Sequence, residues 1–171
     1  MRVMRIARRA VAVLATILST ILALAVSGGM ARANPSMLGT FDFDHPAFLH
    51  ANPAATRHVV IQVSAAAPGH WLMALNNAQN LLAALGAKKV QIVVVAFGPG
   101  LKMLLADSPL ARRVAALDAQ GVEFDVCHNT MAAMARHLGH MPKLVPQAVV
   151  VPAGAERIVQ LEAHGFAYLK P

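Results

Sequence analysis

The order of apolar and polar residues along the chain changes period several times between residues 57 and 171. Short apolar runs rich in Val and Ile are typical of buried strands, and apolar residues that recur every three or four positions are typical of helices. Strands are predicted at residues 59–63, 90–97, 121–126, 148–151 and 166–169. Helices are predicted between them, at residues 70–85, 101–105, 109–120, 130–138 and 152–164.

The predicted helix at residues 70–85 has two distinct faces. Its apolar face follows spacings of four and three residues and consists of Trp71, Leu75, Ala78, Leu82 and Leu85. The other face carries amides rather than charges, at Asn76, Asn77 and Asn80. Amides pair across a subunit interface without the cost of burying charge, so this face is either an oligomer interface or a polar surface in water.

Strands and helices that alternate in this way indicate an α/β fold in a single domain. We predict a mainly parallel five-stranded sheet with helices on both faces, as in flavodoxin-like proteins. Right-handed crossovers place every strand-to-helix loop at one edge of such a sheet, and ligands bind at that edge. The loops concerned are residues 64–69, 98–100 and 127–130.

Residues 1–33 are predicted to be an export signal. Four arginines come first, residues 10–26 are uncharged and largely apolar, and Ala31-Arg32-Ala33 fits a cleavage site. The apolar run is also close to the length that crosses a bilayer, so the alternative is an uncleaved inner-membrane anchor, the one predicted membrane contact. The mature protein is expected in the periplasm. Residues 34–56 have no sustained period and are expected to be a linker or an oligomer arm.

Composition and loop motifs argue against nucleic-acid and nucleotide binding. The chain has 15 Lys and Arg residues against 8 Asp and Glu, but five of the basic residues and none of the acidic ones lie in the signal. The remainder is nearly neutral and has no basic stripe with interleaved aromatic residues. Gly98-Pro99-Gly100 lacks the further glycine of a dinucleotide loop and the Lys-Ser/Thr of a P-loop, so no cofactor is predicted.

Cys127 is the only cysteine of the chain and stands where the strand at 121–126 gives way to the helix at 130–138. Backbone N–H groups at a helix N-terminus favour a thiolate, so Cys127 is the first candidate for chemistry. His128 would supply positive charge or relay a proton, and Asn129 or Thr130 would cap the helix. The alternative is that the thiol is an inert buried residue in a purely structural oligomer.

Soft-metal binding is a second candidate function. Met and His residues follow Cys127 closely in the sequence, and thiolate, thioether and imidazole ligands suit copper. On a helix, however, His128 and His137 fall on opposite sides, so the whole set cannot form one site. Met134, His137 and His140 remain as a local ligand set of a periplasmic copper-binding protein, although methionines on one helix face more often pack in a core.

Three motifs, taken in order, resemble the DsrE/DsrF-like family of sulfur-relay proteins. They are Leu75-Asn76-Asn77, Gly98-Pro99-Gly100 and Cys127-His128-Asn129-Thr130, within stretches such as GVEFDVCHNT and before the ending GFAYLKP. The resemblance extends over residues 57–171, the predicted DsrE-like domain. Members of the family often carry acidic residues in the first strand-to-helix loop, where this chain has Ala65, Ala66 and Ala67.

The resemblance implies that Cys127 carries sulfane sulfur as a persulfide, with His128, Asn129 and Thr130 in supporting positions. A carrier needs a donor protein and an acceptor protein, so we expect transfer between partners rather than turnover by an enzyme acting alone. The family's trimers and hexamers imply a homo-oligomer. The sequence has no second cysteine to release the sulfur as a disulfide, which fits a persulfide carrier.

Overall fold

Five strands form one sheet in which every strand pair is parallel. The computed structural model describes residues 33–171, so the predicted export signal lies outside the described residues except for Ala33. The strands are β1 (Arg57–Val63), β2 (Val90–Ala96), β3 (Val122–Cys127), β4 (Ala148–Val151) and β5 (Ala167–Leu169). Their order in the sheet is β4-β3-β2-β1-β5, and the predicted α/β fold is confirmed, with a sheet that is parallel throughout.

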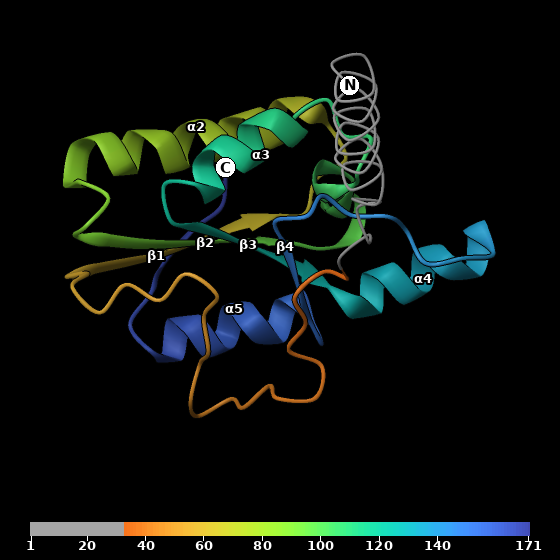
Figure 1. Cartoon of the computed structure of the whole chain (residues 1–171), viewed down its shortest axis with the longest axis horizontal. Helices are drawn as coiled ribbons and strands as arrows, with labels where there is room; N and C mark the ends of the chain where they lie inside the picture. Colours follow the sequence, from red (N-terminus) through yellow and green to blue (C-terminus); the bar gives the residue numbers. More distant parts are fainter. Residues whose placement is uncertain (1–32) are drawn as a thin grey trace, which may run out of the picture. The chain divides into compact units, whose positions relative to one another are not determined.

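Helices cover both faces of the sheet (Figure 1). α2 (Pro68–Leu85) and α3 (Ala111–Asp118) lie on one face, and α5 (Gly154–Ala163) lies on the other. The 3-10 helix η1 (Gly98–Leu104) and α4 (His128–Leu138) follow the carboxyl ends of β2 and β3, and α4 extends away from the sheet. Among residues 33–171, no helix is long and apolar enough to cross a membrane.

The larger hydrophobic core lies between the sheet and the layer of α2 and α3. The predicted apolar face of α2 packs into this core through Trp71, Leu75, Ala78, Leu82 and Leu85. Three residues of β3 enter the same core, namely Val122, Phe124 and Val126. Because side chains alternate along a strand, Glu123 and Asp125 face the opposite side of the sheet, toward α5.

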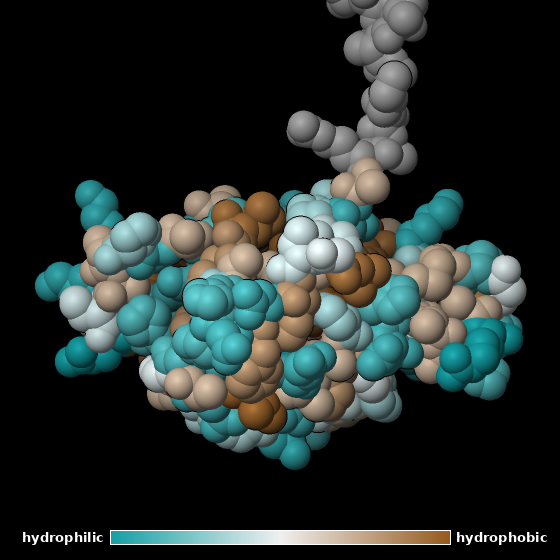
Figure 2. Space-filling model, turned by 90° about the horizontal axis from the view of Figure 1, so that it is seen from below, coloured by the Kyte–Doolittle hydropathy of each residue, from teal (hydrophilic) through white to brown (hydrophobic). Residues whose placement is uncertain are grey.

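Residues 34–56 lie against the sheet as an irregular segment, here named the strap. Ser36 forms a parallel bridge with Val150 at the edge of the sheet, flanked by two backbone hydrogen bonds of 2.8 Å. Farther along, Phe41 and Phe48 are partly buried and pack against the small cores beside β4 and α5. The strap therefore covers the edge of β4 and part of the α5 side. Seen from that side, hydrophobic residues form small patches separated by hydrophilic ones (Figure 2).

Two helices, α3 and α5, begin later than predicted for local reasons. α3 begins at Ala111 rather than at residue 109, because the Ser108 hydroxyl accepts a hydrogen bond from Leu110 N at 3.3 Å and forms a turn ahead of the helix. α5 begins at Gly154 rather than at Pro152, because the backbone of residue 153 is still extended. Both corrections shorten a helix by about one turn or less and leave the order of elements unchanged.

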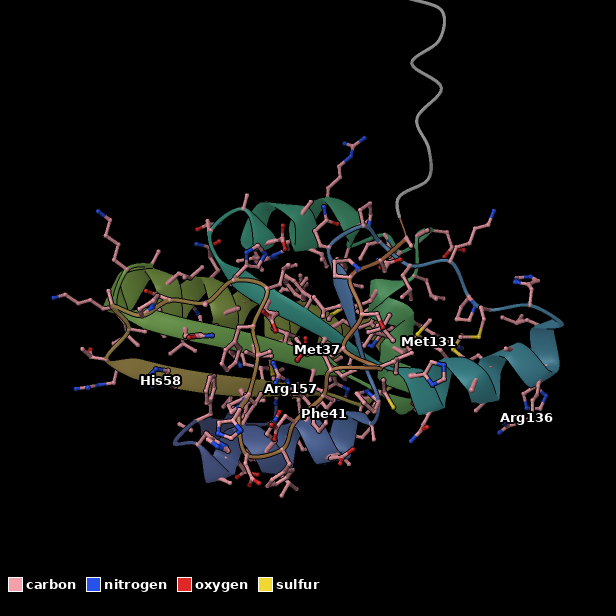
Figure 3. The ribbon with its side chains drawn as sticks, turned by 60° about the horizontal axis from the view of Figure 1, so that its bottom comes forward. Met37, Phe41, His58, Met131, Arg136 and Arg157 are labelled. Carbon is pink, nitrogen blue, oxygen red and sulfur yellow. The ribbon has the colours of Figure 1, made fainter. Side chains whose placement is uncertain are left out.

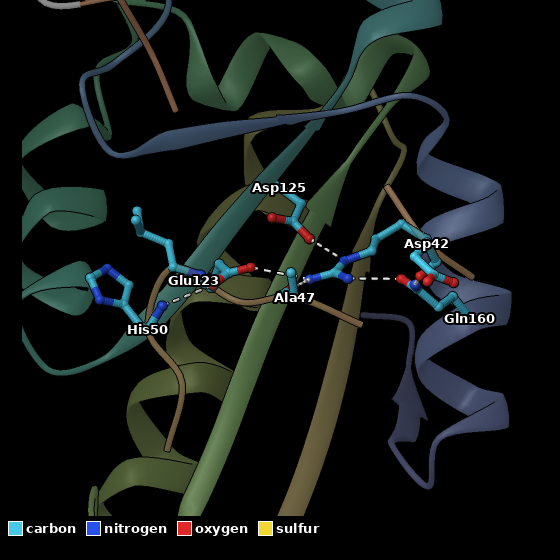
Figure 4. A network of polar contacts seen from close by, with 8 residues as sticks. Asp42, Ala47, His50, Glu123, Asp125 and Gln160 are labelled. Carbon is cyan, nitrogen blue, oxygen red and sulfur yellow. Dashed lines mark hydrogen bonds and ion pairs between the residues drawn. The ribbon is translucent and has the colours of Figure 1, made fainter. Parts of the chain in front are cut away.

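A buried polar cluster joins β3, α5 and the strap (Figure 4). Arg157 projects from α5 toward the sheet (Figure 3), where its Nε donates to Asp125 Oδ2 at 2.7 Å and its Nη2 donates to Glu123 Oε1 at 3.2 Å. Its Nη1 donates to Gln160 Oε1 at 2.8 Å. These four side chains, here named the Asp125 cluster, are each at most 1% exposed. Because Nη2 of Arg157 also donates to the Ala47 carbonyl at 2.9 Å, the cluster holds the strap on the sheet.

Burial sets the protonation of the Asp125 cluster. It raises the pKa of Asp125 from 3.8 to about 8, with the charge of Glu123 adding to this effect and the guanidinium of Arg157 opposing it. Burial also raises the pKa of Glu123. Asp125 Oδ1 accepts no hydrogen bond from residues 33–171 and is the atom left to carry a proton. With one proton on the two carboxyls, the single guanidinium makes the cluster neutral at pH 7.

Candidate functional site

Cys127 ends β3 and also caps the first turn of α4. It pairs with Val151 in the sheet and is 5% exposed. Its Sγ accepts a hydrogen bond from Thr130 N at 3.4 Å, in the position that a Ser, Asp or Asn oxygen usually fills at a helix start. Consequently α4 begins at His128, two residues earlier than predicted. The positive end of the helix dipole lies beside this sulfur.

Three strand-to-helix loops meet beside Cys127. Gly98 N donates to Thr130 Oγ1 at 3.0 Å and so joins η1 to α4. Gly100 lies directly on the end of β1, where a Cβ would stand 2.3 Å from Val63 O. The missing side chain allows η1 to close on β1. The structure thus brings together the loops that were predicted to share one edge of the sheet.

The three residues that follow Cys127 have different environments. Thr130 is half-buried, and its hydroxyl is engaged by Gly98 N. Asn129 is exposed, and its backbone N donates to the loop after β4 at 3.3 Å. His128 is half-buried at the first position of α4, next to the cysteine along the chain. The predicted side-chain capping by Asn129 or Thr130 is wrong, because the thiol itself accepts the hydrogen bond from the first turn.

Two adjoining cavities lie between η1 and α4 and are here named the α4 groove. The larger cavity has a volume of about 480 Å³ and the smaller one about 250 Å³. Both are lined by Lys102 and Met134, and the smaller one reaches Thr130. Thr130 N also donates to the Cys127 sulfur, but Cys127 itself lines neither cavity. Further residues of the larger cavity are Leu105, Leu138, His140, Pro142 and Lys143.

The residues of the predicted soft-metal set line different parts of this groove. Met134 lines both cavities, whereas His137 lines the smaller one and His140 the larger one. Met131 is buried in the main core and Met134 packs against it, as expected of methionines that fill a core. Within residues 33–171, no three His, Cys, Asp or Glu side chains lie close enough together to hold a metal ion.

The Asp125 cluster and Lys143 were not among the predicted site residues. The alternation of Glu123 and Asp125 with apolar residues in GVEFDVC places both acids on one face of a buried strand, together with Cys127. That signal is present in the sequence. Arg157 gives no comparable signal, because an arginine between acidic residues of an amphipathic helix is usually exposed.

Comparisons with known proteins give matches among solved structures. No family model matches the chain, and no curated protein matches its sequence significantly. MTH1491, a protein of unknown function from Methanobacterium thermoautotrophicum, is 33% identical with a TM-score of 0.60, over 67% of this chain and 99% of MTH1491. The ychN protein from E. coli is 15% identical with a TM-score of 0.53, over 68% of this chain and 100% of ychN, and this likeness concerns the fold alone.

Proposed function

The chain belongs to the family of MTH1491 and has the DsrE-like fold, and from this premise we propose that it is a sulfur carrier that holds sulfane sulfur as a persulfide on Cys127. The observation that carries the proposal is the hydrogen bond from Thr130 N to the Cys127 sulfur at the N-terminus of α4. A backbone donor and the positive end of a helix dipole interact favourably with negative charge on sulfur, which a persulfide anion carries.

Loading and unloading are exchange reactions at sulfur. In loading, the Cys127 thiolate attacks the sulfane sulfur of a donor R–S–S⁻. A new S–S bond forms, the S–S bond of the donor breaks, and R–S⁻ leaves with the electron pair. In unloading, an acceptor thiolate attacks the outer sulfur, and Cys127 leaves as the thiolate. Charge is conserved in both steps, and neither needs an external oxidant or reductant.

Two features support retention of the sulfur between these steps. Cys127 is the only cysteine of the chain, so no second thiol of the same subunit displaces the persulfide as a disulfide. Its 5% exposure limits access of small thiols from bulk water. Donor and acceptor must therefore present their sulfur at the edge of the sheet where the three loops meet.

The proposed carrier is an exported homo-oligomer with separate donor and acceptor proteins. Export rests on the predicted signal at residues 1–33, with an inner-membrane anchor as the alternative. On α2, Asn77 and Asn80 line a hollow together with Leu169 of the edge strand β5, and such a mixed polar and apolar surface supports a subunit contact. Sedimentation of the purified protein distinguishes a trimer or a hexamer from a monomer.

Mass spectrometry of the intact protein tests the carrier proposal. After exposure to polysulfide, or to thiosulfate with a sulfurtransferase, we expect an added mass of one sulfur atom that reductant removes. Cys127→Ser should gain no such mass. The control is modification of wild type by N-ethylmaleimide, which shows that the thiol is accessible. A folded protein that takes up this reagent but never takes up sulfur would contradict the proposal.

A further inference from the structure

The α4 groove combines apolar walls with unpaired positive charges. Leu105, Met134 and Leu138 form its walls, and Leu138 is 51% exposed although its side chain is large and apolar. Lys102 and Lys143 also line the larger cavity, and neither takes part in an ion pair within residues 33–171. A cavity with these two properties is complementary to an organic anion.

The net charge of the larger cavity is positive. Its basic side chains are Lys102, Lys143 and His140, and its acidic side chain is Asp107. Nδ1 of His140 lies 2.9 Å from Met141 O. Even with His140 neutral, the two ammonium groups exceed the single carboxylate, so the cavity attracts a singly charged anion.

The size of the groove suits a small molecule. Sites for small ligands usually have volumes of about 300–1,000 Å³, and the larger cavity measures about 480 Å³. Inorganic anions such as thiosulfate are too small to cover its apolar walls. An anion with an aromatic or alkyl body would remove these walls from water, which is favourable by about 25 cal/mol for each Å² of apolar surface buried.

The smaller cavity of the groove ends at Thr130, one helical turn from Cys127, whereas Cys127 itself lines neither cavity. Lys102 and Met134 line both cavities, and the smaller cavity extends along α4 to Thr130, whose backbone N binds the Cys127 sulfur. A molecule with its apolar body in the larger cavity therefore directs its other end past Lys102 toward the first turn of α4.

We propose that the α4 groove binds a small organic anion that carries sulfane sulfur, such as a thiosulfonate or a hydrophobic persulfide, and that this anion is a direct sulfur donor to Cys127. Its apolar body lies between Leu105 and Leu138, and its anionic end lies beside Lys102. The donor assignment rests on the proposed function, whereas binding in the groove is measured without any reaction at the thiol.

The reaction with p-toluenethiosulfonate illustrates the balance of the step. The Cys127 thiolate attacks the sulfane sulfur, a new S–S bond forms, and the bond between this sulfur and the sulfonyl sulfur breaks. p-Toluenesulfinate leaves with the electron pair. One thiolate and one thiosulfonate anion become one persulfide anion and one sulfinate anion, so total charge and oxidation level are unchanged.

Calorimetric titration of Cys127→Ser with p-toluenethiosulfonate tests the groove, because this variant cannot react with the probe. We expect binding that Lys102→Ala weakens about twofold to fivefold, as for the loss of one exposed charge contact. Leu138→Gln should weaken binding of the aromatic probe but not of thiosulfate. Lys170→Ala is the matched control, since Lys170 is exposed and does not line the groove. Circular dichroism checks that Cys127→Ser and the three variants made in addition to it are folded.

Three results would overturn the inference. The first is equal affinity for thiosulfate and p-toluenethiosulfonate, and the second is an affinity for p-toluenethiosulfonate that Lys102→Ala leaves unchanged. The third is binding that appears only after dilution dissociates an oligomer, because this result would identify the groove as a subunit interface. The outcome is separable from that of the carrier proposal. Lysine-dependent binding without sulfur uptake by wild type supports the groove and contradicts the carrier, whereas uptake from a sulfurtransferase without binding in the groove does the reverse.

Discussion

Replacing Arg157 by Met is expected to destabilise the domain strongly, because Arg157 supplies the positive charge of the Asp125 cluster. Its guanidinium donates to Asp125, to Glu123, to the Gln160 side chain and to the Ala47 carbonyl. A methionine fills the space of the aliphatic stem but donates no hydrogen bond. Removing one partner of a buried ion pair typically lowers the free energy of unfolding by about 3–5 kcal/mol.

The loss should also grow with pH. In wild type the pKa of Asp125 is raised from 3.8 to about 8, so the folded protein keeps a proton that the unfolded chain releases between these values. Stability from this carboxyl is therefore present at low pH and is lost as the pH rises toward 8. Without Arg157, the positive charge that lowers both pKa values is gone, and of the groups outside the cluster only the backbone N–H groups of His50 and Leu49 still favour ionised Glu123. Both carboxyls should therefore stay protonated to higher pH in the variant than in wild type. The difference between variant and wild type is thus larger at pH 8 than at pH 5.

Urea unfolding followed by circular dichroism at several pH values measures this effect. Arg136→Met is the matched control, because Arg136 is exposed in the last turn of α4 and its loss should cost about 0.5 kcal/mol or less (Figure 3). Asp125→Asn removes the titrating group and should flatten the wild-type pH dependence. If Arg157→Met costs less than about 1 kcal/mol at pH 8, or if its cost falls as the pH rises, the reasoning is refuted.

Three further predictions concern the loops and the groove. Gly100→Ala should lower the melting temperature by several degrees, because its Cβ would stand 2.3 Å from a backbone oxygen, whereas Gly69→Ala, with open space within 4 Å, should not; equal melting temperatures would contradict the close approach. Thr130→Val removes the acceptor of a loop N–H and should cost about 1–3 kcal/mol in urea unfolding, with recovery in Thr130→Ser, and an unchanged stability would count against the contact. Copper titration of Met134→Leu and His137→Ala should give the stoichiometry and affinity of wild type, because His137 and His140 line different cavities of the groove. A weaker affinity in either variant would instead support the metal site.

Much of the fold could be predicted from sequence because its signals are local. The valine-rich run of β2 and the spacing from Trp71 to Leu85 each specify an element and its buried face. Helix starts were less predictable, because the Ser108 turn and the thiol cap at Cys127 depend on single hydrogen bonds. The strap has no period at all, and only its contacts with distant segments fix its course.

Part of the candidate site could also be predicted, because some of its signals are local in the sequence. The position of Cys127 between a strand and a helix follows from local pattern, and the meeting of the loops follows from the handedness of the crossovers. The α4 groove does not follow from either, since Lys102 and Lys143 are brought to one cavity by the packing of η1 and of the segment after α4. The partners of Arg157 are likewise 32 or more residues away in sequence, apart from Gln160.

The contacts of the strap give the chain an order of folding. Carbonyls at Asp42, Asp44 and Ala47 accept hydrogen bonds from side chains of α5 and from His164, across separations of 110–120 residues. The part of the strap around residues 42–47 therefore lacks these native partners until α5 and His164 have been synthesised. Such long-range closure slows folding. A delay of this kind keeps the strap open during synthesis, which suits the export that we predict from residues 1–33.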